Sequence, residues 1–259
     1  MEGQNGTGSK GEARLEAFFK EHPKCALAFS GGVDSAYLLY AAMKFGADVR
    51  AYYVKSAFQP EFEFEDAKRL VSELRADVTV IPVDVLSDET VRSNPKDRCY
   101  YCKQVIFSTI LREAKADGYT TVLDGTNASD DAADRPGMRA LQEMKVLSPL
   151  RLSGLTKAEI RRLSKEAGLF TWNKPAYACL ATRIPAGEEI TAEKLLATEK
   201  AEGYLFSLGF TDFRVRQMNG IAKLQLPEAQ LPMLLEKREA VLRELGKYYS
   251  SVLLDLEVR

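Results

Sequence analysis

The sequence contains very few of the side chains that most often transfer protons. Among its 259 residues there is one histidine, His22, and one tryptophan, Trp172. Histidine is the side chain whose ordinary pKa suits proton transfer near neutral pH, and His22 directly precedes Pro23 at the end of a predicted helix. General-base catalysis by histidine is therefore not expected, and any chemistry must depend on other residue types.

The sequence also lacks an excess of either charge and any long apolar run. Its 36 lysines and arginines face 37 aspartates and glutamates, so it shows no basic excess of the kind that binds nucleic acid. No apolar run approaches the roughly 20 residues that cross a bilayer, and no signal peptide is visible. We therefore expect a cytoplasmic protein that binds neither nucleic acid nor membrane. Its four cysteines are expected to be thiols rather than disulfides.

Predicted strands alternate with predicted helices over the first two thirds of the chain. The strands cover 25–30, 48–56, 78–85, 120–126 and 145–150, and the helices cover 13–22, 35–46, 62–74, 102–118, 138–144 and 156–168. Alternation at this spacing is typical of an α/β fold in which a parallel sheet carries helices on both faces. Ligands of such sheets bind beyond the carboxyl ends of the strands.

The pattern changes after residue 187. The elements that follow are a helix over 191–208, two strands over 213–218 and 221–226 joined by Asn219-Gly220 as a hairpin, a charged helix over 228–247 and a strand over 251–258. We predict a flexible Gly-rich tail over 1–11, a large α/β domain over 12–187 and a small α+β domain over 188–259.

The stretch SGGVDS lies where a predicted strand passes into a predicted helix. Gly31 and Gly32 permit a phosphate to approach the backbone N–H groups at the start of that helix, and Ser30 and Ser35 add hydroxyl donors. A Walker loop would carry Gly-Lys-Ser/Thr instead. Asp34 is explained if a magnesium ion bridges the phosphates and needs a carboxylate ligand.

SGGVDS resembles the pyrophosphate loop of the N-type ATP pyrophosphatases, the PP-loop superfamily that includes NAD synthetase, GMP synthetase and the tRNA-thiolating enzymes. Members of this superfamily cleave ATP to AMP and pyrophosphate, usually to adenylate a carboxylate or carbonyl oxygen. The resemblance implies that the loop binds the pyrophosphate of ATP together with Mg²⁺.

Three further stretches narrow the resemblance: LDGTNASDDAADRPG (123–137), SPLRLSGLTKAEIRRLSKEAGL (148–169) and WNKPAYACLATRIPAGEEIT (172–191). With the loop they resemble the LarE family over roughly residues 12–226. LarE proteins are the sulfurtransferases that make the thiocarboxylates of the nickel-pincer nucleotide cofactor. They adenylate a carboxylate of pyridinium-3,5-biscarboxylic acid mononucleotide and then deliver sulfur to it.

The resemblance directs attention to a set of charged and hydroxyl side chains as candidate substrate or magnesium contacts. These candidates are Asp124, Thr126, Asp130, Asp131, Arg135, Lys174, Arg183, Arg214 and Arg216. For Asp130 and Asp131 a simple helix-capping role is the open alternative, because aspartate is common before helices. Arg214 and Arg216 suit a substrate phosphate, which matches guanidinium geometry.

The cysteines point to sulfur chemistry. Cys179 lies within five residues of Lys174 and Arg183, cations of the kind that lower a thiol pKa. In one form of the LarE family the matching cysteine gives up its own sulfur and becomes dehydroalanine. Similar three-cysteine LarE proteins bind a 4Fe–4S cluster, which implies Cys99, Cys102 and Cys179 as ligands here. The spacing of Cys99 and Cys102 alone leaves a redox or zinc role open.

Other functions stay open at this stage. They are a tRNA thiolase, a nucleotide-binding iron–sulfur or zinc protein without turnover, and a carboxylate-amidating ligase, which would have little use for three cysteines. The resemblance further implies a nucleotide substrate, a sulfide or sulfur-donor system as partner, and a homo-oligomer, hexameric in the family. Apolar residues over 203–206 are expected at a subunit interface. Cys25 lies in an apolar strand and is expected to be buried.

Overall fold

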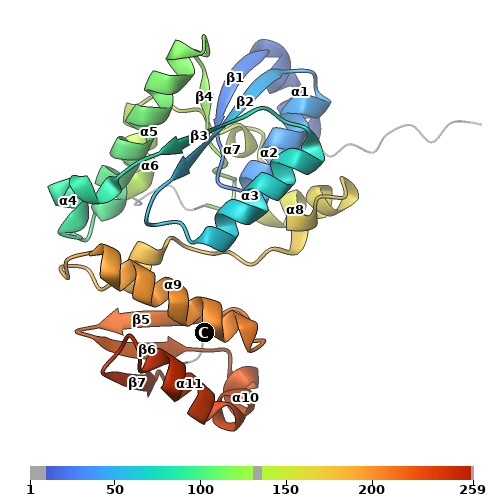
Figure 1. Ribbon diagram of the computed structural model, residues 1–259. Helices are drawn as coiled ribbons and strands as arrows, with labels where there is room; N and C mark the ends of the chain where they lie inside the picture. The colour runs from blue at the N-terminus through green and yellow to red at the C-terminus, as the bar shows by residue number, and fades with distance from the viewer. Residues whose placement is uncertain (1–9, 131–135, 258–259) are drawn as a thin grey trace, which may run out of the picture. The chain divides into compact units, whose positions relative to one another are not determined.

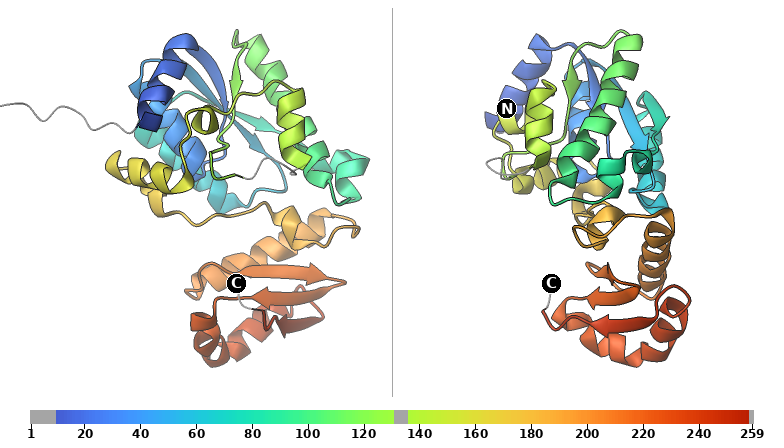
Figure 2. Two further views of the ribbon diagram at one scale, coloured as in Figure 1. Left: turned by 180° about the vertical axis from the view of Figure 1, so that it is seen from behind. Right: turned by 90° about the vertical axis from the view of Figure 1, so that its left-hand side faces the viewer.

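The computed structural model describes residues 10–130 and 136–257, which divide into two compact units (Figures 1 and 2). The first unit comprises the described parts of 1–56, 61–83 and 99–176. The second unit comprises the described parts of 57–60, 84–98 and 177–259. The domain boundary expected between residues 187 and 188 stays a prediction.

The first unit is built on a four-stranded parallel sheet. Its strands, in the order β3-β2-β1-β4, are β1 (Lys24–Ala28), β2 (Asp48–Lys55), β3 (Val78–Pro82) and β4 (Val122–Leu123). Parallel neighbours need long crossover connections, and helices between the strands supply them. The predicted α/β fold with a parallel sheet is confirmed.

Alternating side chains of the strands enter two apolar cores, one on each face of the sheet. In β1, Cys25 and Leu27 belong to one core and Ala26 belongs to the other. Cys25 is fully buried, as predicted. Figure 1 shows helices on both sides of this sheet. The first core includes residues of α1 (Lys10–Glu21), α2 (Val33–Lys44), α3 (Glu61–Leu74) and α8 (Lys157–Glu166), and the second includes residues of α5 (Arg98–Ala116) and α6 (Pro136–Glu143).

Two predictions for the first unit differ from the structure. The strand expected over 145–150 is wrong, because only Leu147 pairs, through an isolated parallel bridge to Leu123. A short helix, α7 (Pro149–Leu152), follows instead. The fixed φ of proline suits the first position of a helix, and its missing N–H weakens a strand. The first helix begins at Lys10, inside the segment predicted as a tail.

The second unit contains a mixed three-stranded sheet of order β5-β6-β7. Asn219 and Gly220 have φ of 47° and 79°, the left-handed backbone that a two-residue hairpin turn needs, so the predicted hairpin is confirmed. Thr191 caps the long helix by accepting a hydrogen bond from the backbone of Lys194. The core lies among α9 (Ala192–Ser207), β5 (Arg214–Met218), β6 (Ile221–Gln225), α10 (Leu231–Glu236) and α11 (Arg238–Leu245), and β7 (Ser251–Leu254) pairs in parallel with β6.

The single helix predicted over 228–247 is interrupted in the structure. A 3₁₀ turn, η4 (Glu228–Gln230), precedes α10, and Lys237 separates α10 from α11. The ammonium group of Lys237 donates a hydrogen bond to the carbonyl of Leu208 at 2.9 Å, which fixes the chain at the break. Two short elements that the sequence did not predict, η1 (Val85–Ser87) and α4 (Glu89–Arg92), are each capped by an aspartate.

The segment 203–206 does not present all of its apolar side chains to solvent. Leu205 is fully buried in the core of the second unit, and Phe206 is 38% exposed. Leu205 therefore stabilises the fold and is not available to a partner. Across residues 10–130 and 136–257, none of the helices combines the length and the apolar character needed to span a bilayer.

Candidate active site

The loop between β1 and α2 has a backbone that only glycine tolerates at one position. Gly31 has a φ of 73°, and a β-carbon added to it would lie 2.9 Å from the β-carbon of Ala67 in α3. Both facts exclude a larger residue, because the left-handed conformation is strained for other residues and the space is already filled. The loop is therefore held close to α3 at Gly31.

Hydrogen bonds between Ser30 and Ser35 connect the two ends of the SGGVDS stretch. The hydroxyls of Ser30 and Ser35 lie 3.0 Å apart, and the backbone N–H of Ser30 donates to the Ser35 hydroxyl. The Ser35 hydroxyl also donates to the carbonyl of Gly32. Gly32 occupies the N-cap position of α2 without a side-chain cap, so the first N–H groups of this helix point to where an anion can bind.

Asp34 has one carboxylate oxygen in an ion pair and one oxygen without a hydrogen bond among the described residues. Its Oδ2 accepts from the ammonium group of Lys157 at 2.6 Å, whereas its Oδ1 is buried and unpartnered there. Burial raises the pKa of Asp34, and Lys157 partly opposes this shift. A buried carboxylate oxygen lacking a donor fits a hard cation such as Mg²⁺, which prefers oxygen ligands.

Lys157 was missed in the sequence analysis. It is the first residue of α8, whose N-terminus is fixed by a capping box between Thr156 and Glu159. The contact of Lys157 with Asp34 joins residues that are 123 positions apart, so no local sequence pattern predicts it. The only feature of the sequence that could have indicated Lys157 was its position directly after a helix cap, in a stretch that resembles the LarE family.

The carboxyl end of β4 lies directly against the start of α2. A β-carbon added to Gly125 would lie 3.0 Å from the backbone nitrogen of Ser35. The neighbouring Asp124 is 5% exposed and accepts hydrogen bonds from the hydroxyls of Ser148 and Thr126. The structure therefore brings Asp124 and Thr126 together at the strand end, next to the loop between β1 and α2.

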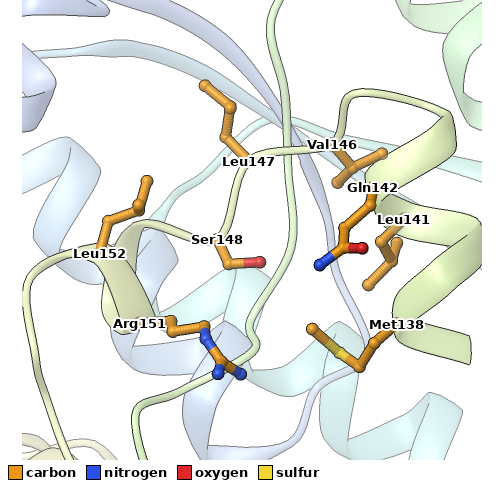
Figure 3. Close-up of a pocket in the computed structure, with 8 residues that line it drawn as sticks. All are labelled: Met138, Leu141, Gln142, Val146, Leu147, Ser148, Arg151 and Leu152. Carbon is orange, nitrogen blue, oxygen red and sulfur yellow. The ribbon is translucent and has the colours of Figure 1, made fainter. Parts of the chain in front are cut away.

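A pocket of about 210 Å³ adjoins Asp124 through Ser148. Figure 3 shows the polar ends of Gln142, Ser148 and Arg151 pointing to the same space, with Met138 among the apolar walls. Arg151 also donates to the backbone carbonyl of Asp130 at 3.1 Å. The pocket can therefore accommodate a small group with both apolar and anionic character.

The loop after β4 is held by local hydrogen bonds. The carboxylate of Asp130 accepts from the backbone N–H of Asn127 at 2.9 Å, and the hydroxyl of Ser129 accepts from the backbone N–H of Lys157. Asp130 therefore has a turn-stabilising contact besides any ligand role. The predicted contacts Asp131 and Arg135 lie outside the described residues.

The first two turns of α5 carry two cysteines and a half-buried lysine, Lys103. Cys99 is exposed and Cys102 is half-buried, and residues three apart on a helix are neighbours on one face, so both sulfurs can reach one ion. Burial lowers the pKa of Lys103, while the charges of Asp124, Cys99, Asp130 and Cys102 oppose the shift. Lys103 was missed, although its place next to Cys102 was a signal.

Lys174 is already neutralised by carboxylates. It follows the 3₁₀ turn η2 (Phe170–Asn173), and its ammonium group lies 2.8 Å from Glu63 and 2.7 Å from Asp66 of α3. Only 11% of the side chain is exposed. Its main contact is therefore with α3, and it would have to exchange a carboxylate to bind a substrate.

Cys179 lies at the start of the 3₁₀ turn η3 (Leu180–Arg183) in the second unit. Its backbone carbonyl accepts hydrogen bonds from the backbone and the hydroxyl of Thr182. Arg183 is fully buried and forms a bidentate ion pair with Glu202 at 2.8 and 3.0 Å. The guanidinium of Arg183 therefore stabilises the segment that carries Cys179, rather than standing open to a ligand.

Arg214 and Arg216 of β5 also have protein partners. Arg214 donates to the carbonyl of Phe213 at 2.6 Å, with its guanidinium 5.3 Å from the Tyr177 ring centre. Arg216 donates to Gln225 and to the carbonyl of Thr182, both at 2.7 Å. Both arginines thus contribute to the surroundings of the Cys179 segment.

Within the described ranges, no three His, Cys, Asp or Glu side chains form a group able to hold a metal ion. Cys99 and Cys102 belong to the first unit and Cys179 belongs to the second. The iron–sulfur ligation expected from the sequence stays a prediction.

The parallel sheet and the loop at the start of α2 define a member of the PP-loop superfamily. The tRNA-specific 2-thiouridylase of Thermotoga sp. is 24% identical to the chain, over 76% of this chain and 69% of that protein. No family model matches. The pyridinium-3,5-bisthiocarboxylic acid mononucleotide synthase of Lactiplantibacillus plantarum is 36% identical over 95% of this chain and 90% of its own length. An uncharacterised protein of Synechocystis is also 36% identical, covering 94% and 92%. The chain belongs to the LarE family.

Proposed function

We propose that the chain is an ATP-dependent sulfurtransferase that converts a carboxylate of pyridinium-3,5-biscarboxylic acid mononucleotide to a thiocarboxylate. The observation that carries the ATP-dependent step is Asp34, with a buried oxygen that has no described partner, at the N-terminus of α2, where the N-cap residue Gly32 has no side-chain cap. The thiocarboxylate product is supported by the name of the L. plantarum relative.

In the first half-reaction a carboxylate oxygen of the substrate attacks the α-phosphorus of ATP. A new P–O bond forms while the bond to the bridging oxygen breaks, and pyrophosphate leaves with the electron pair. Ser30, Gly31, Gly32 and Ser35 would bind the phosphates through N–H and O–H donors. Mg²⁺, held by Asp34, would offset the phosphate charge, and Lys157 would supply a second positive charge.

In the second half-reaction sulfur attacks the activated acyl carbon, and AMP leaves with the electrons of the C–O bond. As donor, the Cys179 thiolate forms a thioester; loss of its Cα proton then breaks the Cβ–S bond, giving the thiocarboxylate and dehydroalanine. A 4Fe–4S cluster on Cys99, Cys102 and Cys179 would instead supply replaceable sulfur from a sulfide or other donor. The pair Cys99 and Cys102 on one helical turn fits such a group.

The alternative of a tRNA thiolase is supported only by more distant relatives, at 24% identity. Its polyanionic substrate calls for a basic surface, and the formal net charge of −1 provides no general excess. We also propose that the chain forms a homo-oligomer, which light scattering would test. A monomer at working concentrations would contradict that part of the proposal.

The two half-reactions can be separated by variants in the two units. Asp34→Asn should lower AMP and pyrophosphate formation at least tenfold, because it removes the carboxylate that would hold Mg²⁺ beside the phosphates. Cys179→Ala should keep AMP and pyrophosphate formation within about twofold and lose the thiocarboxylate, because the thiol acts only after adenylation. Both products are measured in one reaction by liquid chromatography and mass spectrometry.

Asp77→Asn, which alters an aspartate in the connection between α3 and β3, serves as a matched charge control and should behave as the unaltered protein. Full pyrophosphate release by Asp34→Asn would remove Asp34 from the metal role. Normal thiocarboxylate yield from Cys179→Ala would exclude that cysteine from sulfur delivery.

A further inference from the structure

The buried carboxylate of Glu202 accepts hydrogen bonds from residues on both sides of Cys179 in the sequence. Glu202 lies on α9, and its side chain is 2% exposed. Its two oxygens accept from the bidentate guanidinium of Arg183, from the hydroxyl of Tyr177 and from the backbone N–H of Val215. Tyr177 precedes Cys179 by two residues and Arg183 follows it by four, so the segment carrying Cys179 is fastened at both ends to one side chain.

Arg183 also donates hydrogen bonds to residues near Cys179, and these bonds restrain the backbone there. Its NH1 group donates to the carbonyl of Ala178 and to the hydroxyl of Thr182, each at 2.9 Å. The Thr182 hydroxyl in turn donates to the carbonyl of Cys179 at 2.8 Å. The guanidinium also lies 4.6 Å from the ring centre of Tyr177, which stacks the two anchors against each other.

These contacts use most of the donors that a guanidinium has, and they are shielded from water. A buried bidentate pair contributes directional restraint more than net stability, because desolvation offsets much of the attraction. The residues it restrains are the neighbours of a candidate nucleophile, and Cys179 itself stays partly exposed. The arrangement thus combines a rigid backbone with an accessible sulfur.

We propose that Glu202 is the positioning residue of Cys179, holding its segment in the geometry needed for sulfur delivery. This inference rests on the proposed function, in which Cys179 acts after adenylation. Glu202 does not contact substrate in this scheme and acts through Arg183 and Tyr177. Charge, and not only shape, matters, because both partners donate hydrogen bonds to the carboxylate.

The test is Glu202→Gln, which keeps the shape of the side chain and removes its charge. We expect AMP and pyrophosphate formation within about twofold of the unaltered protein, thiocarboxylate yield at least tenfold lower, and a rate of Cys179 alkylation by iodoacetamide changed at least threefold. Peptide mass spectrometry of the native protein reports the alkylation. Glu193→Gln, an exposed glutamate on the same helix, is the matched control and should change none of these quantities.

Tyr177→Phe covers the case in which Glu202→Gln does not fold. It removes one hydrogen bond and leaves the ion pair, so we expect a smaller change of the same sign in alkylation and thiocarboxylate yield. A folded Glu202→Gln or Tyr177→Phe with unaltered thiocarboxylate yield and alkylation would overturn the positioning role. Equal loss of both half-reactions in Glu202→Gln would also overturn it, because that result marks a general structural role.

Cys179→Ala in the same assay distinguishes the two proposals. If Cys179→Ala loses thiocarboxylate formation and a folded Glu202→Gln keeps it, only the positioning role fails. If Cys179→Ala keeps thiocarboxylate formation, the proposed use of Cys179 fails, and the positioning role fails with it.

Discussion

At the scale of single residues, the burial of each cysteine determines whether its thiol can react or bind a metal. Cys25 has no exposed surface, and burial, aided by the charge of Asp48, raises the pKa of its thiol to about 12. Cys99 is exposed, and Cys102 and Cys179 are partly exposed. Because the thiolate is the form that reacts and binds metals, Cys25 is inert at neutral pH and serves as a small apolar side chain.

The raised pKa of Cys25 predicts how stability depends on pH. An unfolded cysteine loses its proton near pH 8.5, whereas the folded thiol keeps it to about pH 12. The native state therefore binds more protons in this interval, and the stability due to the thiol falls as the pH rises. The difference in free energy of unfolding between the protein and Cys25→Ala should shrink by on the order of 1–2 kcal/mol between pH 8.5 and 10.

Guanidinium unfolding of both proteins at the two pH values measures this change. Both proteins contain the same buried tyrosines, such as Tyr53. The titration of these tyrosines therefore contributes equally to both free energies of unfolding and does not affect their difference. A difference that stays constant with pH would contradict the account of Cys25.

The sequence offered candidate residues from local patterns and missed residues whose partners are distant in the chain. Asp34 was predicted because it belongs to the SGGVDS stretch at the start of a predicted helix, and Asp124 because it lies at the end of a predicted strand. Lys157 and Glu202 were missed because the contact of Lys157 with Asp34 and that of Glu202 with Arg183 depend on tertiary packing. The same limit applies to Arg183, which was predicted to bind substrate and is instead fully buried against Glu202.

At the scale of elements, the approach of α3 to the loop between β1 and α2 explains the need for glycine at position 31. Gly31→Ala would place a β-carbon 2.9 Å from Ala67 and strain a φ of 73°. We expect a stability loss of about 1–2 kcal/mol from the left-handed backbone, and at least a tenfold weaker affinity for ATP because the loop must move. Thermal unfolding and calorimetry with Mg²⁺–ATP measure the two effects.

Gly46→Ala is the matched control. Gly46 has a similar φ of 78°, with no atom within 4 Å of an added β-carbon. It should show a similar loss of stability and unaltered ATP affinity. Equal ATP affinity in Gly31→Ala and Gly46→Ala would show that contact with α3 does not shape the binding site.

Whole elements were predictable where a pattern of buried residues is long and uninterrupted. The strand β2 and the helix α9 follow their predicted ranges closely. The region 145–150 was mistaken for a strand because Val146 and Leu147 form a short apolar run, whereas Pro149 starts a helix there. The break at Lys237 was missed because the flanking residues continue a helical pattern.

At the scale of the whole molecule, candidate catalytic and metal-binding residues occur in both compact units. Asp34, Asp124, Cys99 and Cys102 belong to the first unit, and Cys179 belongs to the second. The alternation of strands and helices predicted the sheet of the first unit, since it follows from local patterns. The sequence pattern could not reveal that residues 57–60 and 84–98 belong with the second unit, because that grouping depends on contacts between distant segments.

The proposed cluster predicts a metal content for the intact protein. Purified without oxygen and reconstituted, the protein should contain about four irons and about four acid-labile sulfides per chain. Cys99→Ala and Cys102→Ala should each lose most of the iron, while Cys25→Ala, whose thiol is buried, should keep it. Iron-free protein after reconstitution would exclude the cluster and leave Cys179 as a consumed donor.

The most direct test of the central claim is the stoichiometry of one reaction. The intact protein is incubated with ATP, Mg²⁺, sulfide and pyridinium-3,5-biscarboxylic acid mononucleotide, and AMP, pyrophosphate and thiocarboxylate are quantified together. The account predicts equal amounts of the three products, none of them formed without the acceptor mononucleotide. Thiocarboxylate formed without consumption of ATP, or AMP and pyrophosphate released without any thiocarboxylate, would contradict it.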